Sequence, residues 1–147
     1  MLLFLVAAFV FAMDQSAKHF AVLYLKHGSS VPVFGKCFYL TLVENTGIAF
    51  GILQEYAPAL LLVITASVLA LLVYSLFRHP SGRYKQVAYG FILGGALGNL
   101  TDRLRLGHVV DFLDFRIWPV FIFADTFITI GVGSFLLIAF KKEPHAS

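Results

Sequence analysis

Long apolar segments limit most strongly what this chain can fold into. Within its 147 residues, four such segments cover about 1–23, 57–77, 86–104 and 122–140. A helix of about 20 residues crosses the roughly 30 Å of hydrocarbon in a bilayer. Helices also satisfy their own backbone polar groups in lipid, which open strands cannot do. We therefore predict a mainly α integral membrane protein, with a single domain over 1–147 and four transmembrane helices.

The composition agrees with lipid as the main solvent, since 59% of the residues are apolar and only 13% are charged. The net charge of +3 is not gathered in a basic stripe, so no nucleic-acid partner is expected. Cys37 is the single cysteine, which excludes an internal disulfide and a thiolate metal cluster. The five histidines are scattered without a His-Glu-x-x-His motif, so we expect neither a metal nor a cofactor.

The distribution of basic residues indicates how the spans are oriented. An even number of spans puts both termini on one side of the membrane. The first apolar segment has no Lys or Arg before it and no small-x-small cleavage site after it, so we expect a retained span rather than a cleavable signal peptide. The short linker 78–85 and the tail from Lys141 together hold five Lys and Arg residues. The positive-inside rule places them, and both termini, in the cytoplasm. Segments of about 24–56 and 105–121 are then extracytoplasmic.

Two local patterns refine this outline. The run Phe38–Val43 is rich in aromatic and β-branched residues, which favours a short strand or hairpin on the outer membrane surface. Together with the four helices, it predicts a small extracytoplasmic β-containing subdomain. Gly90, Gly94 and Gly98 recur at every fourth position of the third apolar segment, a spacing that lets another helix approach closely.

Polar side chains gather at one predicted level, the outer membrane interface. An ionisable group at bilayer depth costs about 2.5–3.5 kcal/mol and therefore marks a candidate functional site. Helical spacing places Asp14 with Lys18, and Asn99 with Asp102 and Arg103, so that each group can satisfy its own charges locally. This favours a role in helix packing for these five residues.

Asp111 and Asp125 differ, because neither has a basic residue nearby at helical spacing. Two carboxylates in close contact share a proton, since both cannot ionise, and so provide one acid and one base near neutral pH. Such a pair can hydrolyse an amide. A proton or cation relay through the spans is equally compatible with buried aspartates. The pattern alone therefore leaves a peptidase and a proton-coupled transporter open.

Five blocks of residues nevertheless occur in the order typical of one family. They are Asp14-Gln15-x-x-Lys18; Glu44-Asn45-Thr46-Gly47-Ile48-Ala49-Phe50; Gly94-Gly95-Ala96-Leu97-Gly98-Asn99-Leu100-Thr101-Asp102-Arg103; Gly107-His108-Val109-Val110-Asp111-Phe112; and Phe121-x-x-Ala124-Asp125. Over nearly its whole length, the chain resembles the type II signal peptidases, which process bacterial lipoproteins.

The resemblance implies an aspartic endopeptidase of the bacterial cytoplasmic (inner) membrane, acting at its outer face. It implies catalysis by Asp111 and Asp125 and a substrate that is a diacylglyceryl-prolipoprotein, cut before its lipidated cysteine. By position, the residues that shape the site or bind substrate are Asp14, Lys18, Asn45, Gly47, Ala49, Phe50, Asn99, Asp102 and Arg103. The loop from Asn45 to Phe50 and the preceding strand are expected to cover the substrate. Membrane lipid and this substrate are the expected partners of a monomer.

One position departs from the family pattern, because Ile122 stands where an asparagine usually follows the phenylalanine. We hypothesise that losing this amide weakens the positioning of the aspartates or of the substrate, which an unchanged rate in Ile122→Asn would refute. An inactive relative that only binds lipoproteins is the alternative. Asp114 is assigned to the surface, and Trp118 and Tyr39 to an outer aromatic belt rather than to recognition.

Overall fold

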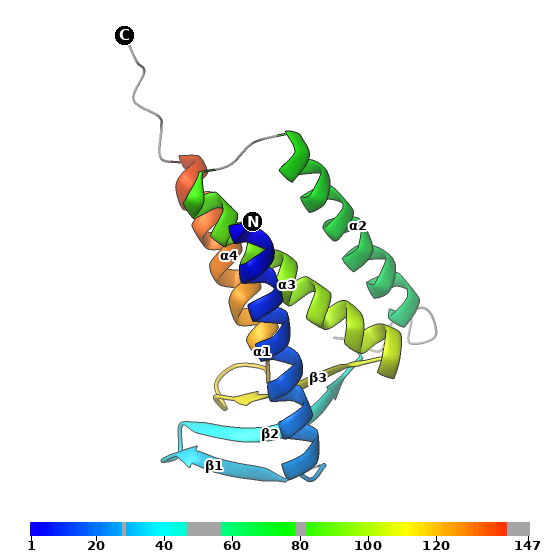
Figure 1. Cartoon of the computed structure of the whole chain (residues 1–147). Helices are drawn as coiled ribbons and strands as arrows, with labels where there is room; N and C mark the ends of the chain where they lie inside the picture. Colours follow the sequence, from blue (N-terminus) through cyan, green and yellow to red (C-terminus); the bar gives the residue numbers. More distant parts are fainter. Residues whose placement is uncertain (28, 47–56, 79–81, 141–147) are drawn as a thin grey trace.

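The computed structural model describes residues 1–27, 29–46, 57–78 and 82–140, and contains four helices and three strands (Figure 1). In chain order these elements are α1 (Leu2–Tyr24), β1 (Ser30–Phe34), β2 (Phe38–Asn45), α2 (Ala57–Arg78), α3 (Arg83–Leu106), β3 (Val109–Asp114) and α4 (Phe123–Phe140). The four helices coincide with the four apolar segments to within three residues at each end. The chain is therefore mainly α with one small sheet, as predicted.

Helix α1 is long and apolar enough to cross a membrane by itself. The apolar part of α4, Phe123–Leu137, is shorter than a membrane-spanning helix needs to be. The C-terminal third of α3 is polar and includes Asn99, Asp102 and Arg103. Among the helices in the described ranges, α1 alone has both the length and the apolar composition of a membrane-spanning helix.

Small residues hold three helices together, with α3 between α1 and α4. A Cβ added at Gly94 would lie 2.6 Å from the Ala7 carbonyl oxygen of α1, and one at Gly95 would lie 2.7 Å from the Ala124 carbonyl oxygen of α4. Gly90 and Gly98 also face α1. The predicted close helix approach is thus confirmed. Helix α2 packs against α3 alone among the helices and stands apart from α1 and α4 in Figure 1.

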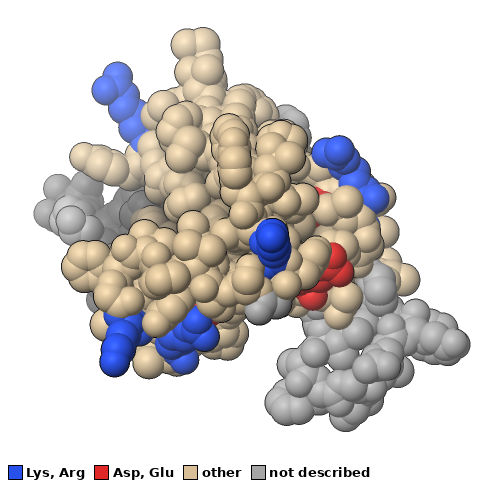
Figure 2. All heavy atoms as spheres, turned by 90° about the horizontal axis from the view of Figure 1, so that it is seen from below, with Lys and Arg blue, Asp and Glu red and all other residues tan. Residues whose placement is uncertain are grey.

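The strands form an antiparallel sheet at one end of the helices, in the order β1-β2-β3. The β1–β2 hairpin confirms the strand expected around Phe38–Val43, and Gly35 takes a positive φ of 54° in its turn. Strand β3 was not predicted, because all six of its residues are buried and the sequence shows no alternation of apolar and polar positions. From the sheet end, uncharged residues form most of the described surface, with scattered basic side chains (Figure 2).

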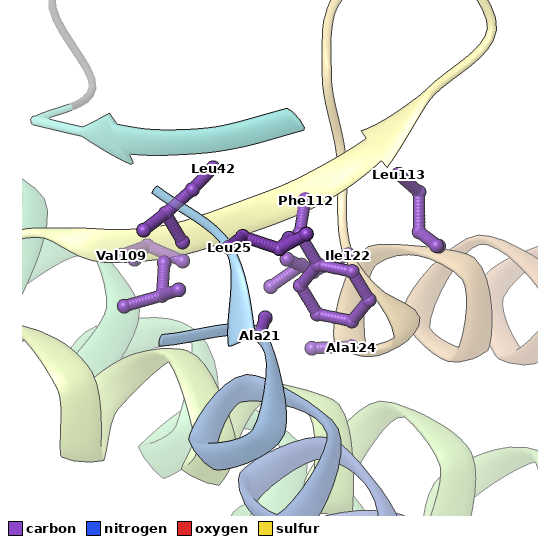
Figure 3. Close-up of a cluster of buried hydrophobic side chains, with 9 residues drawn as sticks. Ala21, Leu25, Leu42, Val109, Phe112, Leu113, Ile122 and Ala124 are labelled. Atoms are coloured by element: carbon purple, nitrogen blue, oxygen red, sulfur yellow. The ribbon is translucent and has the colours of Figure 1, made fainter. Parts of the chain in front are cut away.

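An apolar cluster joins the sheet to the helices (Figure 3). Its buried members come from α1, β2, β3 and the start of α4, and are Ala21, Leu25, Leu42, Val109, Val110, Phe112, Leu113, Ile122 and Ala124. Ile122, the departure from the family pattern, is fully buried in this cluster. The cluster fixes β3 against the first turn of α4, and these are the elements that carry Asp111 and Asp125.

Candidate active site

The two candidate catalytic carboxylates are each held by an asparagine from a different element. Asp111 lies on β3 and is 2% exposed, and its Oδ2 accepts a hydrogen bond of 2.7 Å from Asn45 Nδ2 at the end of β2. The register explains this contact, because Val43 lies opposite Asp111 and Asn45 is its diagonal neighbour on the same face. Asp125 is half-buried in the first turn of α4, and its Oδ1 accepts a hydrogen bond of 3.0 Å from Asn99 Nδ2 on α3.

The second oxygen of Asp111 is the unusual atom of the site. Oδ1 is buried and has no hydrogen-bond partner in the part of the chain that the structure describes. Burial raises the pKa of Asp111 to about 6, while the Asn45 hydrogen bond lowers it and the negative charge of Asp125 raises it further. The charge of Asp125 therefore acts on Asp111, and Asp111 has an oxygen suited to bind a proton or a water molecule.

Lys18 is the buried cation of the network. Its Nζ lies 2.6 Å from Asp14 Oδ2 and 2.7 Å from Asp102 Oδ2, and donates to Asn99 Oδ1 at 3.3 Å. The predicted pairing of Asp14 with Lys18 on α1 is confirmed. Asp102 finds its cation on another helix, so the expectation that each group satisfies its charges locally is wrong. The reason is the close approach of α1 and α3, which buries all three charges together.

Asp14 also connects the first helix to the last. Its Oδ1 accepts a hydrogen bond of 3.1 Å from the backbone N–H of Ala124, the second residue of α4. The first four N–H groups of a helix lack partners within it, and a carboxylate near that end is favoured by the helix dipole. A Cβ on Gly98 would collide with the Asp14 carboxylate, so glycine is needed there.

Arg103 and Gln15 complete the network from its two sides. Arg103 Nη1 donates to the Asn99 carbonyl oxygen at 3.4 Å, and its charge, with that of Lys18, lowers the pKa of Asp111. Gln15 Nε2 donates to Asp102 Oδ1 at 3.0 Å. The sequence reasoning did not select Gln15 as a site residue, although it lies inside the first family block. The role of the Ala124 backbone N–H as a donor to Asp14 could not have been predicted from side-chain chemistry.

The structure brings together most of the residues expected at the site, and three lie outside its described residues. One set of contacts joins Asp125, Asn99, Lys18, Asp14 and Asp102, with Arg103 beside them. A separate hydrogen bond joins Asn45 to Asp111. Gly47, Ala49 and Phe50 fall in the undescribed range 47–56. In the ranges described, no group of three His, Cys, Asp or Glu side chains is arranged to hold a metal ion.

Asp114 is buried, which corrects its assignment to the surface. Its Oδ2 accepts a hydrogen bond from the Thr41 hydroxyl, and its Oδ1 accepts one from the backbone N–H of Arg116, each 2.8 Å long. The Thr41 hydrogen bond lowers the pKa of Asp114.

A cavity of about 600 Å³ adjoins Asp125, and we call it the Asp125 cavity. Most of its wall is apolar. One side is formed by α4 and the other by the segment before it, and the lining residues are Phe115, Ile117, Trp118, Phe121, Asp125, Thr126, Thr129 and Ile130. Asp125 is thus accessible to a ligand with apolar groups.

Known proteins share both the sequence and the fold of this chain. The family model described as signal peptidase (SPase) II matches residues 6–141. The lipoprotein signal peptidase of Nostoc punctiforme is 43% identical over 148 residues, covering 99% of this chain and 94% of the relative. That of Caldanaerobacter subterraneus subsp. tengcongensis is 46% identical over 127 residues, covering 86% and 87%.

A bacterial membrane enzyme solved by the in meso method at 1.9 Å resolution superposes with a TM-score of 0.86 at 35% identity, covering 95% of this chain and 92% of that one. A second such structure, solved at 2.3 Å, gives a TM-score of 0.83 at 34% identity. Family, sequence and fold agree over nearly the same residues. This chain belongs to the signal peptidase II family.

Proposed function

We propose that this chain is an aspartic endopeptidase of the bacterial cytoplasmic membrane that removes signal peptides from diacylglyceryl-prolipoproteins, cutting before the lipidated cysteine. Its relatives carry the name lipoprotein signal peptidase, which gives the substrate class. The observation that carries the catalytic assignment is the pair Asp111 and Asp125: the charge of Asp125 raises the pKa of the buried Asp111, and Asp125 lines a cavity. Neither a proton-coupled transporter nor an inactive binding relative is supported by the comparisons.

In the proposed reaction the two carboxyl groups share one proton. The ionised group takes a proton from a water molecule as the water oxygen adds to the carbonyl carbon of the scissile amide. The protonated group donates to the carbonyl oxygen, and a proton then passes to the amide nitrogen as the C–N bond breaks. The products are the carboxyl terminus of the signal peptide and the free amine of the lipidated cysteine. The unpartnered Asp111 Oδ1 is suited to hold the water or the shared proton.

The surrounding network has a positioning role in this proposal. Asn99 accepts from Lys18 and donates to Asp125, so its amide is fixed with its NH₂ group toward the catalytic carboxylate. The NH₂ group of Asn45 likewise donates to Asp111. The charges of Lys18 and Arg103 lower the pKa of Asp111 and so limit how far burial can suppress its ionisation.

We further propose four spans, with both termini cytoplasmic and the active site at the outer membrane face. Support comes from the four helices, from the in meso membrane enzymes that share the fold, and from the position of sheet and dyad at one end of the bundle (Figure 1). Here the scissile bond of a lipid-anchored substrate meets water. We also propose that the protein acts as a monomer in membrane lipid.

The test is cleavage of a diacylglyceryl-prolipoprotein by the purified protein in lipid, followed by gel shift. We expect the parent to cut, and Asp111→Asn and Asp125→Asn each to lose at least about 10³-fold in rate, since each removes one partner of the acid-base pair. Ser67→Ala, which alters an exposed hydroxyl on α2 away from the Asp125 cavity, is the control and should cut at nearly the parent rate. A folded Asp111→Asn or Asp125→Asn variant with near-parent activity would refute the dyad.

A further inference from the structure

The segment between β3 and α4 forms one wall of the Asp125 cavity. This groove wall comprises residues 115–121, and four of its side chains line the cavity. Little of it is buried, since Ile117 is 93% exposed and Trp118 is 70% exposed. Its last residue, Phe121, forms an isolated β-bridge with Leu113 of β3. An exposed segment of this kind needs a specific restraint to keep a cavity open beside a catalytic group.

Asp114 supplies that restraint at the point where the wall leaves the sheet. Its carboxylate accepts hydrogen bonds from the Thr41 hydroxyl and the Arg116 backbone N–H, each 2.8 Å long. The same carboxylate lies 3.5 Å from Arg116 Nε. The guanidinium of Arg116 stacks over the Tyr39 ring, 3.9 Å from its centroid. We call Asp114, Thr41, Arg116 and Tyr39 the Asp114 clamp.

The backbone shows that the clamp imposes a conformation the chain would not adopt unaided. Arg116 has a φ of 64°, in the left-handed region, and is the one non-glycine residue with positive φ in the described ranges. This conformation is unfavourable for a residue with a side chain and persists where surrounding contacts fix it. The Asp114 hydrogen bond to its N–H and the Tyr39 stack are those contacts. They direct the next residues, Ile117 and Trp118, toward the cavity.

Aromatic packing transmits this restraint along the wall. The Phe115 ring lies 4.8 Å from Phe38 of β2 and is stacked on Phe121 at 5.7 Å. Phe115 and Phe121 both line the Asp125 cavity. The position of this wall relative to Asp125 therefore depends on the contacts that anchor it to β2.

We propose that Asp114 is a positioning residue for the reaction, acting through Arg116 to hold the groove wall at the distance from Asp125 that the substrate requires. The inference rests on the proposed function, because it takes the cavity beside Asp125 to be where substrate lies. It also assigns Trp118 to the substrate cavity rather than only to an aromatic belt. Asp114 does not touch the reacting atoms, so its loss acts on substrate binding more than on the chemical step.

The experiment compares Asp114→Asn and Arg116→Ala with the parent. Arg83→Ala, which alters an exposed arginine at the far end of α3, is the matched control. We expect KM for the diacylglyceryl-prolipoprotein to rise about tenfold in both clamp variants, equivalent to ~1.4 kcal/mol, with kcat within about twofold. Arg116→Ala changes an exposed side chain, so it keeps the test available if Asp114→Asn does not fold.

Trp118 is the single tryptophan, so its fluorescence reports on the wall without a label. Both clamp variants should lower its anisotropy in the substrate-free protein, while Arg83→Ala leaves it unchanged. If the parent fails to cut, the proposed function fails, and the anisotropy still tests the clamp. If the parent cuts but the folded clamp variants keep the parent KM, or lose kcat alone, the positioning role of Asp114 is refuted.

Discussion

Asp111 lies in a place that does not favour a charge. Burial raises its pKa from the ordinary value of 3.8 to about 6, so the folded protein binds a proton there more tightly than the unfolded chain does. The stability contributed by this group is complete below pH 3.8 and is lost as the pH rises through about 6. The site therefore gives up stability at neutral pH in order to hold a reactive carboxylate.

Replacing Asp111 by asparagine should remove this pH-dependent penalty while keeping an oxygen to accept from Asn45. Above pH 6 we expect Asp111→Asn to be more stable than the parent, by on the order of 2 kcal/mol, with the difference shrinking as the pH falls to 4. Thermal unfolding between pH 4 and 8, followed by Trp118 emission, measures it. A difference in stability that does not vary with pH would contradict the assignment.

Single residues could be predicted where the chemistry is local. The pairing of Asp14 with Lys18 follows from helical spacing, and the selection of Asp111 from its lack of a basic neighbour. The contact of Lys18 with Asp102 requires knowing that α1 and α3 pack together, which spacing within one helix cannot give. Ile122 illustrates the same limit, because it lies in an apolar cluster where an asparagine would need a buried partner. The rate of Ile122→Asn remains the test of that hypothesis.

At the level of elements, α3 organises the site because its glycines let α1 and α4 approach on two sides. Gly94 faces backbone and Val10 of α1, whereas nothing lies within 4 Å of a Cβ added at Gly133 of α4. The same chemical change therefore meets a packed interface at one helical glycine and open space at the other.

We expect Gly94→Ala to lower the free energy of unfolding by about 1–3 kcal/mol, because α1 must move away from α3. Gly133→Ala should be neutral or stabilise by up to about 1 kcal/mol, since alanine favours the helix. Thermal unfolding of both variants in the same detergent makes the comparison. Equal effects at the two positions would mean that the α1–α3 contact is not as close as described.

Elements were predictable where their periodicity or length is distinctive. The four helices follow from apolar length, and the β1–β2 hairpin from a run of β-branched and aromatic residues. Strand β3 has neither signal, because it is short and buried along its whole length between two helices. Its pairing with β2 sets the position of Asp111, so the sequence identified the catalytic candidate without showing what holds it.

The whole molecule separates a helical part from a sheet that lies at one end with the dyad (Figure 1). If the four helices span the membrane as proposed, the hairpin turn and the start of α3 lie on opposite sides. Cys37, the single cysteine, is exposed in that turn. The protein thus carries a natural probe of its own orientation.

A membrane-impermeant maleimide should label Cys37 in right-side-out membrane vesicles and not in inside-out ones. The control is Gly82→Cys combined with Cys37→Ser, because Gly82 is the N-cap residue just before α3 and has open space around it. This control should label with the opposite preference. Labelling of both cysteines from one side would exclude the four-span arrangement.

The hydrogen bond from the Ala124 N–H to Asp14 joins positions 110 residues apart. The ribosome makes α1 first and α4 last, so the Asp14 carboxylate lacks this partner throughout most of synthesis. Asp125 also arrives only with α4. If Asp111 and Asp125 are the catalytic pair, a nascent chain that has made only its first three helices lacks at least half of it and cannot yet act as a protease.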